Sequence, residues 1–113
     1  MKKIKQRDIW LTDLDPTKGS EQAEIRPVVI ISGDLMNKHL NVVITCPLTT
    51  KIKNYQGNVV LLPDDKNQLK QTSEILTFHL RSMSKDRLLK KVGVISNEEL
   101  QQIKNCLDDI LRY

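Results

Sequence analysis

The residues best suited to chemistry gather where a polar loop runs into an apolar strand. Residues 19–24 are mostly polar and lead through Arg26 and Pro27 into a run of β-branched residues. Because a proline restricts the residue before it to extended geometry, Arg26 is held at the start of the strand. A guanidinium stays charged near neutral pH, and its planar fork of donors fits a phosphate. The spacing alone favours an ordinary surface salt bridge over an anion site, so further features must decide between them.

The composition limits the kinds of protein that this chain can be. Its 113 residues are the length of one domain, and we expect a single domain over residues 1–113. The formal net charge is +4 and the sequence pI is near 9.1, which is compatible with an anionic partner such as nucleic acid. No apolar run approaches the ~18 residues of a membrane helix, and the basic start lacks the apolar segment of a signal peptide. We therefore expect a cytoplasmic protein with no membrane association.

Metal and cofactor chemistry find little support in the sequence. The two cysteines, Cys46 and Cys106, and the two histidines do not show metal-ligand spacing, and no glycine-rich phosphate loop is present. The sequence therefore predicts no metal centre and no cofactor. In a reducing compartment both cysteines are expected to be small buried hydrophobes.

Short apolar runs between turn residues predict a sheet. Strands are expected at residues 9–14, 28–31, 42–48, 58–62, 74–77, 80–83 and 91–95, with a helical turn through residue 39 capped by Asp34 and a turn at 84–88. The continuous run 28–31 is typical of a central strand covered on both faces. Ser96 and Glu99 form a capping-box pattern, and apolar residues then recur every three or four positions, which predicts a helix over 97–112. Together these elements favour a strongly bent antiparallel sheet or small barrel with the helix packed on it.

Several segments together resemble the MazF/PemK-type toxins, the toxic halves of bacterial toxin–antitoxin pairs. They are residues 8–16, the sequence Gly19-Ser20-Glu21-Gln22, and residues 26–32, with weaker similarity over 43–49 and 80–88. The resemblance covers most of the chain. It implies a mainly β (α+β) fold, a small twisted SH3-like β-barrel with a C-terminal helix, and it implies a homodimer.

The same resemblance implies an activity. It is that of a metal-independent, sequence-specific endoribonuclease that cuts single-stranded mRNA and so inhibits translation and growth. The RNA 2′-hydroxyl attacks its own phosphate and leaves a 2′,3′-cyclic phosphate and a 5′-hydroxyl. A cognate antitoxin with an acidic tail, disordered until bound, would cover the site, and DNA would be contacted only through that complex.

The family's catalytic arginine matches Arg26, and its catalytic threonine matches Thr49. Arg26 suits the stabilisation of charge on the phosphorane, and Thr49 could bind a phosphate oxygen or the 2′-hydroxyl. Because arginine is a poor proton acceptor, Glu21 and His79 are the candidates for general acid–base catalysis, and the sequence does not decide between them. His79 stands where the family usually has a glutamine, and a surface histidine with no catalytic role is the simpler interpretation.

Further RNA contacts are expected on both sides of these residues. The candidates are Ser20, Gln22, Lys51, Lys53, Tyr55 and Arg81. The segment after Thr49 combines two lysines with an aromatic side chain on which a base can stack, although a solvated hairpin loop has the same composition. The chain departs from the family at Arg7 and Glu24, where glycine is common. Arg7 puts in doubt a glycine-dependent geometry before the first strand, and Glu24 adds a carboxylate near Arg26.

Two other functions remain open from the sequence. One is a non-enzymatic toxin of the CcdB type, which shares the fold and binds DNA gyrase. The other is a nucleic-acid-binding module that has lost catalysis. Residues 109–113 do not match the C-terminal pattern of the gyrase-binding toxins, and the retention of Arg26 and Thr49 favours the nuclease.

Overall fold

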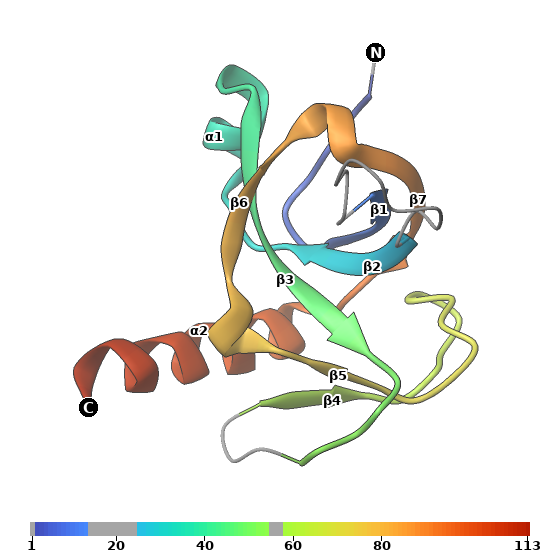
Figure 1. Ribbon diagram of the computed structural model, residues 1–113, viewed down its shortest axis with the longest axis vertical. Helices are drawn as coiled ribbons and strands as arrows, with labels where there is room; N and C mark the ends of the chain where they lie inside the picture. The colour runs from blue at the N-terminus through green and yellow to red at the C-terminus, as the bar shows by residue number, and fades with distance from the viewer. Residues whose placement is uncertain (1, 14–24, 55–57) are drawn as a thin grey trace, which may run out of the picture.

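A computed structural model describes residues 2–13, 25–54 and 58–113, which form an antiparallel sheet and one long helix (Figure 1). The strands are β1 (Asp8–Asp13), β2 (Ile25–Ile30), β3 (Val42–Thr49), β4 (Val59–Leu61), β5 (Ser73–Ile75), β6 (Arg81–Ser84) and β7 (Leu88–Val94). The helices are α1 (Asp34–His39) and α2 (Asn97–Arg112), with 3-10 turns η1 (Thr77–His79) and η2 (Lys85–Arg87). No helix in this described part is both long and apolar enough to cross a membrane.

The sheet bends because β3 has more than one neighbour on the same edge. The strand order is β4-β5-β3-β2-β1-β7, and β6 also pairs with β3. β6 pairs with the first half of β3 and β5 with its last residues, so the sheet turns along the length of this strand (Figure 1). The predicted bent antiparallel sheet with a C-terminal helix is confirmed. Among the described residues the strand path ends at β4 and β7, so the curled sheet does not close into a complete barrel.

Both faces of the sheet are buried. Val28, Val29 and Ile30 of β2 are all 0% exposed. Since successive strand residues point to opposite faces, Val28 and Ile30 pack with Trp10 in one apolar cluster, and Val29 packs in a second one under α2. The prediction of a central strand covered on both faces is confirmed, and Trp10 is part of the core.

Helix α2 has the bounds and the cap that the sequence predicts. The Glu99 backbone N–H donates to Ser96 Oγ at 3.0 Å, and Glu99 Oε1 accepts from the Ser96 backbone N–H at 2.8 Å. Leu100 and Ile103 are its buried residues, and they pack on the sheet. Local capping and an apolar stripe are therefore enough to define this element.

Helix α1 also forms where expected, but its predicted cap is wrong. The N-cap is Gly33, and Asp34 is the first residue of the helix. The Asp34 carboxylate instead accepts a hydrogen bond from the Gln6 backbone N–H at 2.8 Å. This long-range contact ties α1 to the segment before β1.

The boundaries of the later strands differ from the prediction. Thr77, predicted at the end of a strand, is instead the first residue of η1. The Leu76 N–H makes the last hydrogen bond to β3, to Pro47 O at 2.9 Å, and the chain then leaves the sheet. The His79 N–H closes the turn on Leu76 O at 3.1 Å. The last strand begins at Leu88, three residues earlier than predicted, directly after the expected turn.

Arg7 takes the backbone conformation that glycine adopts most easily. Its φ is +82°, in the left-handed region. Its backbone N–H donates to Ile30 O at 2.9 Å, and its carbonyl accepts from the Ile95 N–H at 2.9 Å. The guanidinium Nη1 also donates to Ile95 O at 3.0 Å. The geometry before the first strand is therefore kept by an arginine that bonds to elements on both sides.

The cysteines are isolated from solvent to different degrees. Cys46 is 0% exposed, and burial raises the pKa of its thiol to about 12. Cys106 of α2 is half-buried, and burial raises its pKa too. Cys46 is the small buried hydrophobe that the sequence predicts, whereas Cys106 lies at the edge of the same core.

Gly93 of β7 has no room for a side chain. A Cβ there would lie 2.4 Å from Asn67 O and 2.5 Å from Lys66 O, both backbone atoms. We expect Gly93→Ala to lower the free energy of unfolding by about 1–3 kcal/mol, because the facing turn must shift. Urea unfolding followed by circular dichroism measures this change.

Gly33→Ala is the matched control. A Cβ at Gly33 meets nothing within 4 Å, and its φ of −69° suits alanine. We expect a change of less than about 1 kcal/mol in either direction. Equal losses in the two variants would show that crowding at Gly93 is not the cause.

Candidate functional site

β2 and β3 bring Arg26 and Thr49 to the same end of the sheet. Val28 of β2 pairs with Pro47 of β3 in an antiparallel register. Continuing this register by two residues on each strand sets Arg26 opposite Thr49. Opposed residues share a face, so both belong to the face of Val28 and Pro47. On this continued register, the two residues that match the family's catalytic pair would face each other across adjacent strands.

The backbone pairing of β2 with β3 stops just before these two residues. Val28 and Pro47 form its last pair among the described residues. Pro27 would face Leu48 in the next pair and has no N–H to donate, which explains why the ladder ends here; the carbonyl of Pro47 faces the other edge of β3, where it accepts from the Leu76 N–H. Arg26 and Thr49 therefore lie just beyond the β2–β3 ladder, while Arg26 still pairs with Thr12 of β1 and Thr49 with Glu74 of β5.

The backbone of Arg26 is held from β1, and its side chain faces solvent. Arg26 pairs with Thr12, and Thr12 Oγ1 donates to Arg26 O at 3.1 Å. Thr12 is 0% exposed, whereas Arg26 is exposed. A rigid backbone and an exposed guanidinium are what recognition of a phosphate requires.

Thr49 is half-buried at the last position of β3. Its Oγ1 accepts a hydrogen bond from the Lys51 backbone N–H at 3.1 Å. A hydroxyl that accepts in this way keeps its own proton for donation. The turn after β3 therefore orients the Thr49 hydroxyl as a donor next to Arg26.

A buried carboxylate fastens the loop that follows Thr49. Glu74 of β5 is 0% exposed. Its Oε1 accepts from the backbone N–H groups of Lys53 at 2.8 Å and Asn54 at 3.2 Å, and its Oε2 accepts from Asn58 Nδ2 at 3.2 Å. Asn58 Oδ1 in turn accepts from Thr77 Oγ1 at 2.8 Å. One carboxylate thus joins the two ends of the loop to β5 and η1.

Sequence reasoning missed Glu74, although it is the residue paired with Thr49 across β3 and β5. The available signal was an acidic residue inside an apolar strand segment. Such a residue is seldom buried without partners, so it points to an internal hydrogen-bond network. The partners lie about 20 positions away in sequence, and the fold alone reveals them.

The predicted RNA contacts near Thr49 are only partly described. Lys51 and Lys53 are exposed in the loop that Glu74 holds, and Asn54 takes a left-handed φ of +55° there. Four other predicted residues lie outside the described residues, namely Ser20, Glu21, Gln22 and Tyr55.

His79 and Arg81 lie along the other edge of β3 from β2. Arg81 of β6 is exposed and pairs with Thr45, whose Oγ1 donates to Arg81 O at 3.3 Å. Thr45 is four residues before Thr49, or ~13 Å along the strand. His79 ends η1, between β5 and β6, and its exposed ring meets the Phe78 ring edge-on with centroids 4.5 Å apart. The structure thus sets Arg81 opposite Thr45, and it sets His79 between β5 and β6, on the edge of β3 away from β2.

Within the described ranges, no group of three or more histidine, cysteine or acidic side chains is placed to hold a metal ion. The described groups at this end of the sheet include the guanidinium, hydroxyl and ammonium groups above and the carboxylate of Asp13, which pairs with Ile25 and has a buried Oδ1 without a hydrogen-bond partner. The guanidinium, hydroxyl and ammonium groups bind anions or hydrogen-bond acceptors.

Comparison with known proteins agrees with this geometry. Residues 5–111 match the family described as PemK-like, MazF-like toxin of type II toxin–antitoxin systems. The chain is 35% identical over 106 residues to an endoribonuclease MazF of Staphylococcus saprophyticus, covering 93% of this chain and 88% of that protein.

Solved structures show the same fold at lower identity. The MazE–MazF complex of Deinococcus radiodurans (Form-II) aligns with a TM-score of 0.81 at 21% identity, over 96% of this chain and 95% of that one. A mycobacterial endoribonuclease in complex with its cognate antitoxin aligns with a TM-score of 0.76 at 20% identity, over 98% and 95% of the two chains.

The hydrogen bonds of Glu74 predict the effect of a charge swap. Glu74→Gln keeps the shape but sets an NH2 group against a donor, either Asn58 Nδ2 or a loop N–H. We expect it to speed hydrogen exchange of the Lys53 and Asn54 amides and to lower the free energy of unfolding by about 1–3 kcal/mol. NMR-detected hydrogen exchange and urea unfolding measure both effects.

The second change, Asn58→Asp, tests the cause. Combined with Glu74→Gln, it restores a donor facing an acceptor and moves the carboxylate to position 58, where it still accepts from Thr77 Oγ1. We expect the double variant to recover most of the lost amide protection. If the double variant is no better protected than Glu74→Gln, the paired contact with Asn58 does not hold the loop.

Proposed function

Because the chain belongs to the PemK-like, MazF-like toxins of type II toxin–antitoxin systems, we propose that it is an endoribonuclease that cuts single-stranded RNA. The observation that supports this proposal is the β2–β3 register, whose continuation beyond Val28 and Pro47 would bring Arg26 opposite Thr49. The staphylococcal relative is named an endoribonuclease, and it shares 35% of its aligned residues with this chain.

The proposed reaction uses a nucleophile that the RNA supplies. The 2′-oxygen loses its proton and forms a bond to the adjacent phosphorus, while the bond from phosphorus to the 5′-oxygen breaks and that oxygen gains a proton. Arg26 stabilises the extra negative charge on the phosphorane, because its guanidinium is charged throughout the reaction. The Thr49 hydroxyl donates a hydrogen bond to a phosphate oxygen and so orients the phosphorus toward attack.

Two proton transfers remain, and the candidates for them are His79 and Glu21. His79 is exposed at the end of η1, on the edge of β3 away from Arg26. A strand of RNA lying across β3 would reach both edges, which would let an imidazole act on one of the two oxygens. Lys51, Lys53 and Arg81 would bind neighbouring phosphates on this path.

The proposal includes the partners and the compartment that the family implies. Relatives of this fold are solved together with antitoxins, one in Deinococcus radiodurans and one from a mycobacterial species. A cognate antitoxin with an acidic tail is therefore the proposed inhibitor, a homodimer the proposed assembly, and the cytoplasm, where mRNA is found, the proposed location. Gyrase binding of the CcdB type gains no support from the family match.

Substitution of the two central residues tests the reaction. We expect Arg26→Ala to lower the cleavage rate by about 10²–10³-fold, as for loss of a donor that stabilises transition-state charge. We expect Thr49→Ala, which removes one neutral hydrogen bond, to lower it by about tenfold. Mapping of 5′ ends on a long RNA incubated in EDTA measures the rate and identifies 5′-hydroxyl products.

The neighbouring Thr50 and the distant Arg112 provide matched controls. Both side chains are exposed, and Arg112 is paired with Asp108 at the end of α2. We expect Thr50→Ala and Arg112→Ala to cleave at the wild-type rate. An inactive wild-type protein that still binds RNA would refute the nuclease proposal and support a binding module.

The pH dependence of cleavage tests His79. An imidazole changes its charge between about pH 5 and pH 8, so an acid–base role predicts an inflection of the rate in that window. We expect His79→Gln to remove this inflection and to lower the rate at its optimum. An unchanged rate and profile would exclude His79 and leave Glu21 as the candidate.

A further inference from the structure

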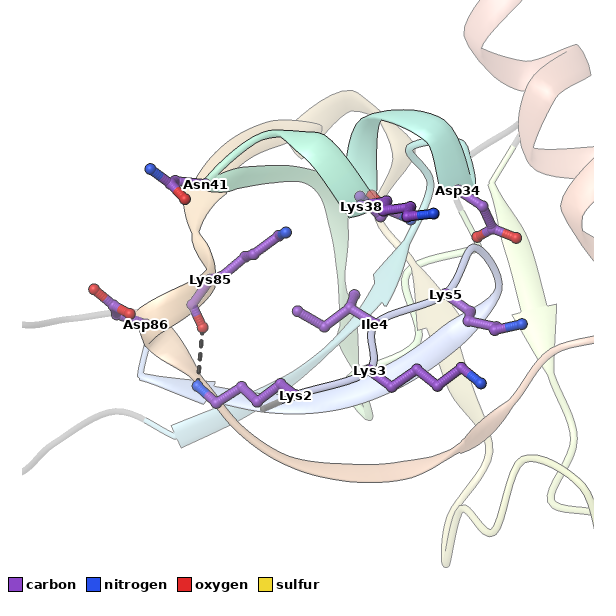
Figure 2. A pocket seen from close by; sticks show the side chains of 10 residues that line it. Lys2, Lys3, Ile4, Lys5, Asp34, Lys38, Asn41, Lys85 and Asp86 are labelled. Atoms are coloured by element: carbon purple, nitrogen blue, oxygen red, sulfur yellow. Dashed lines mark hydrogen bonds between the residues drawn. The ribbon is translucent and has the colours of Figure 1, made fainter.

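A second charged surface lies at the end of β3 that is remote from Thr49. A cleft of about 950 Å³ opens between the segment before β1, helix α1 and the turn η2 (Figure 2). Its lysines are Lys2, Lys3, Lys5, Lys38 and Lys85, and its acidic residues are Asp34 and Asp86. We call this surface the lysine cleft. Its net charge of +3 compares with +4 for the whole chain, so most of the excess positive charge gathers here.

The fold gathers these lysines without neutralising them. They come from three separate segments of the chain, and in the part of the chain that the structure describes none of them forms an ion pair. Asp34 accepts from the Gln6 backbone N–H, and the Lys2 ammonium donates to the Lys85 carbonyl at 3.0 Å. Like charges brought together repel one another, so this arrangement is stabilised when an anion enters.

The walls of the lysine cleft are fixed by the core. Ile4 is 8% exposed and belongs to the apolar cluster of Trp10 and Val28. Asn37 is buried, and its Nδ2 donates to Ser32 O at 2.9 Å. Figure 2 shows the lysine side chains arranged around Ile4, with their ammonium groups pointing in different directions. Ammonium groups on flexible stems suit a chain of phosphates better than one ligand of fixed shape.

The position of the lysine cleft relative to Arg26 and Thr49 fits one extended polyanion. β3 runs from Val42, next to the cleft residue Asn41, to Thr49, a distance of ~23 Å. Arg81 and Lys85 lie on the connected segment β6–η2, which follows β3 from its middle to the cleft. The exposed Arg81 and the half-buried Lys85 therefore lie between the middle of β3 and the cleft.

We propose that the lysine cleft binds the phosphate backbone of the single-stranded RNA substrate, several nucleotides away from the bond that is cut. This inference rests on the proposed function and adds a subsite to it. RNA held at Arg26 is tethered close to the cleft, so a second contact forms at high effective concentration. An acidic protein segment has the same sign of charge, and the experiment distinguishes it from RNA. Because the contact is to phosphates, it adds affinity and salt dependence without base preference.

The test compares two RNAs and two triple variants. The RNAs are one of about 25 nucleotides that spans both sites and one of about 6 nucleotides centred on a mapped cut. Each carries a 2′-deoxy nucleotide at the cut for binding measurements and the natural ribose for rates. The cleft variant is Lys3→Gln/Lys5→Gln/Lys38→Gln, which leaves the contact between Lys2 and Lys85 intact. The control variant, Lys66→Gln/Lys70→Gln/Lys104→Gln, removes three exposed lysines elsewhere.

We expect the cleft variant to bind the long RNA at least tenfold more weakly and to reduce the slope of log affinity against log salt by about 2. We expect its cleavage of the short RNA to stay within twofold of wild type, which shows an intact fold and catalytic pair. The control variant should bind both RNAs nearly as wild type does.

Three other outcomes overturn the inference. Equal losses in the two variants would mean that net charge alone acts, and equal losses on the two RNAs would mean that the lysines act at the cut itself. If the cleft variant loses binding to poly-glutamate but not to the long RNA, the occupant is an acidic protein segment. If the wild-type protein binds RNA through the lysine cleft but cleaves none, the nuclease proposal fails while the cleft remains an RNA-binding surface. Failure of the nuclease proposal is therefore distinguishable from failure of the cleft proposal.

Discussion

The pairing of β3 with neighbours on both of its edges fixes the position of every described residue in the candidate site. β2 pairs along one edge, while β6 and then β5 pair along the other. A register shift of one residue would move Thr49 to the opposite face, and it would separate Thr49 from Arg26 and Glu74 together. The register is itself fixed by burial, since the residues of β3 alternate between two apolar clusters. The packing of the core therefore also fixes the position of the site.

That constraint explains why so small a chain can hold an exposed site rigidly. Val28 and Ile30 are buried on one face and Val29 on the other, so β2 cannot move without disturbing both cores. Arg26 is two residues from Val28, and its carbonyl is bonded to a buried threonine of β1. Arg26 is exposed on this fixed backbone. A polymer substrate needs such a surface rather than a deep cavity.

The parts of this structure that sequence could predict are those that depend on neighbouring residues. The bounds of α2 follow from the Ser96–Glu99 capping box and the apolar stripe, which are local. The Arg-Pro pair and Thr49 were recognised by resemblance, and the structure adds that one register aligns them. Glu74 was missed because its partners are 16 to 21 positions away and are mostly backbone N–H groups, which leave no trace in the sequence. Arg7 was expected to disturb the entry to β1, but hydrogen bonds to Ile30 and Ile95 compensate for its strained φ.

A buried carboxylate opposite Thr49 looks unfavourable for a site that must bind phosphate, and its hydrogen bonds resolve the difficulty. Glu74 is 0% exposed, and two backbone N–H groups and one side-chain amide point their positive ends at its oxygens. These dipoles offset the negative charge locally, whereas the cations of the same loop, Lys51 and Lys53, face solvent. The carboxylate therefore orders the loop from beneath while the outer surface stays positive. Charge is arranged by depth: the carboxylate that holds the loop is buried, and the lysines proposed to bind RNA are exposed.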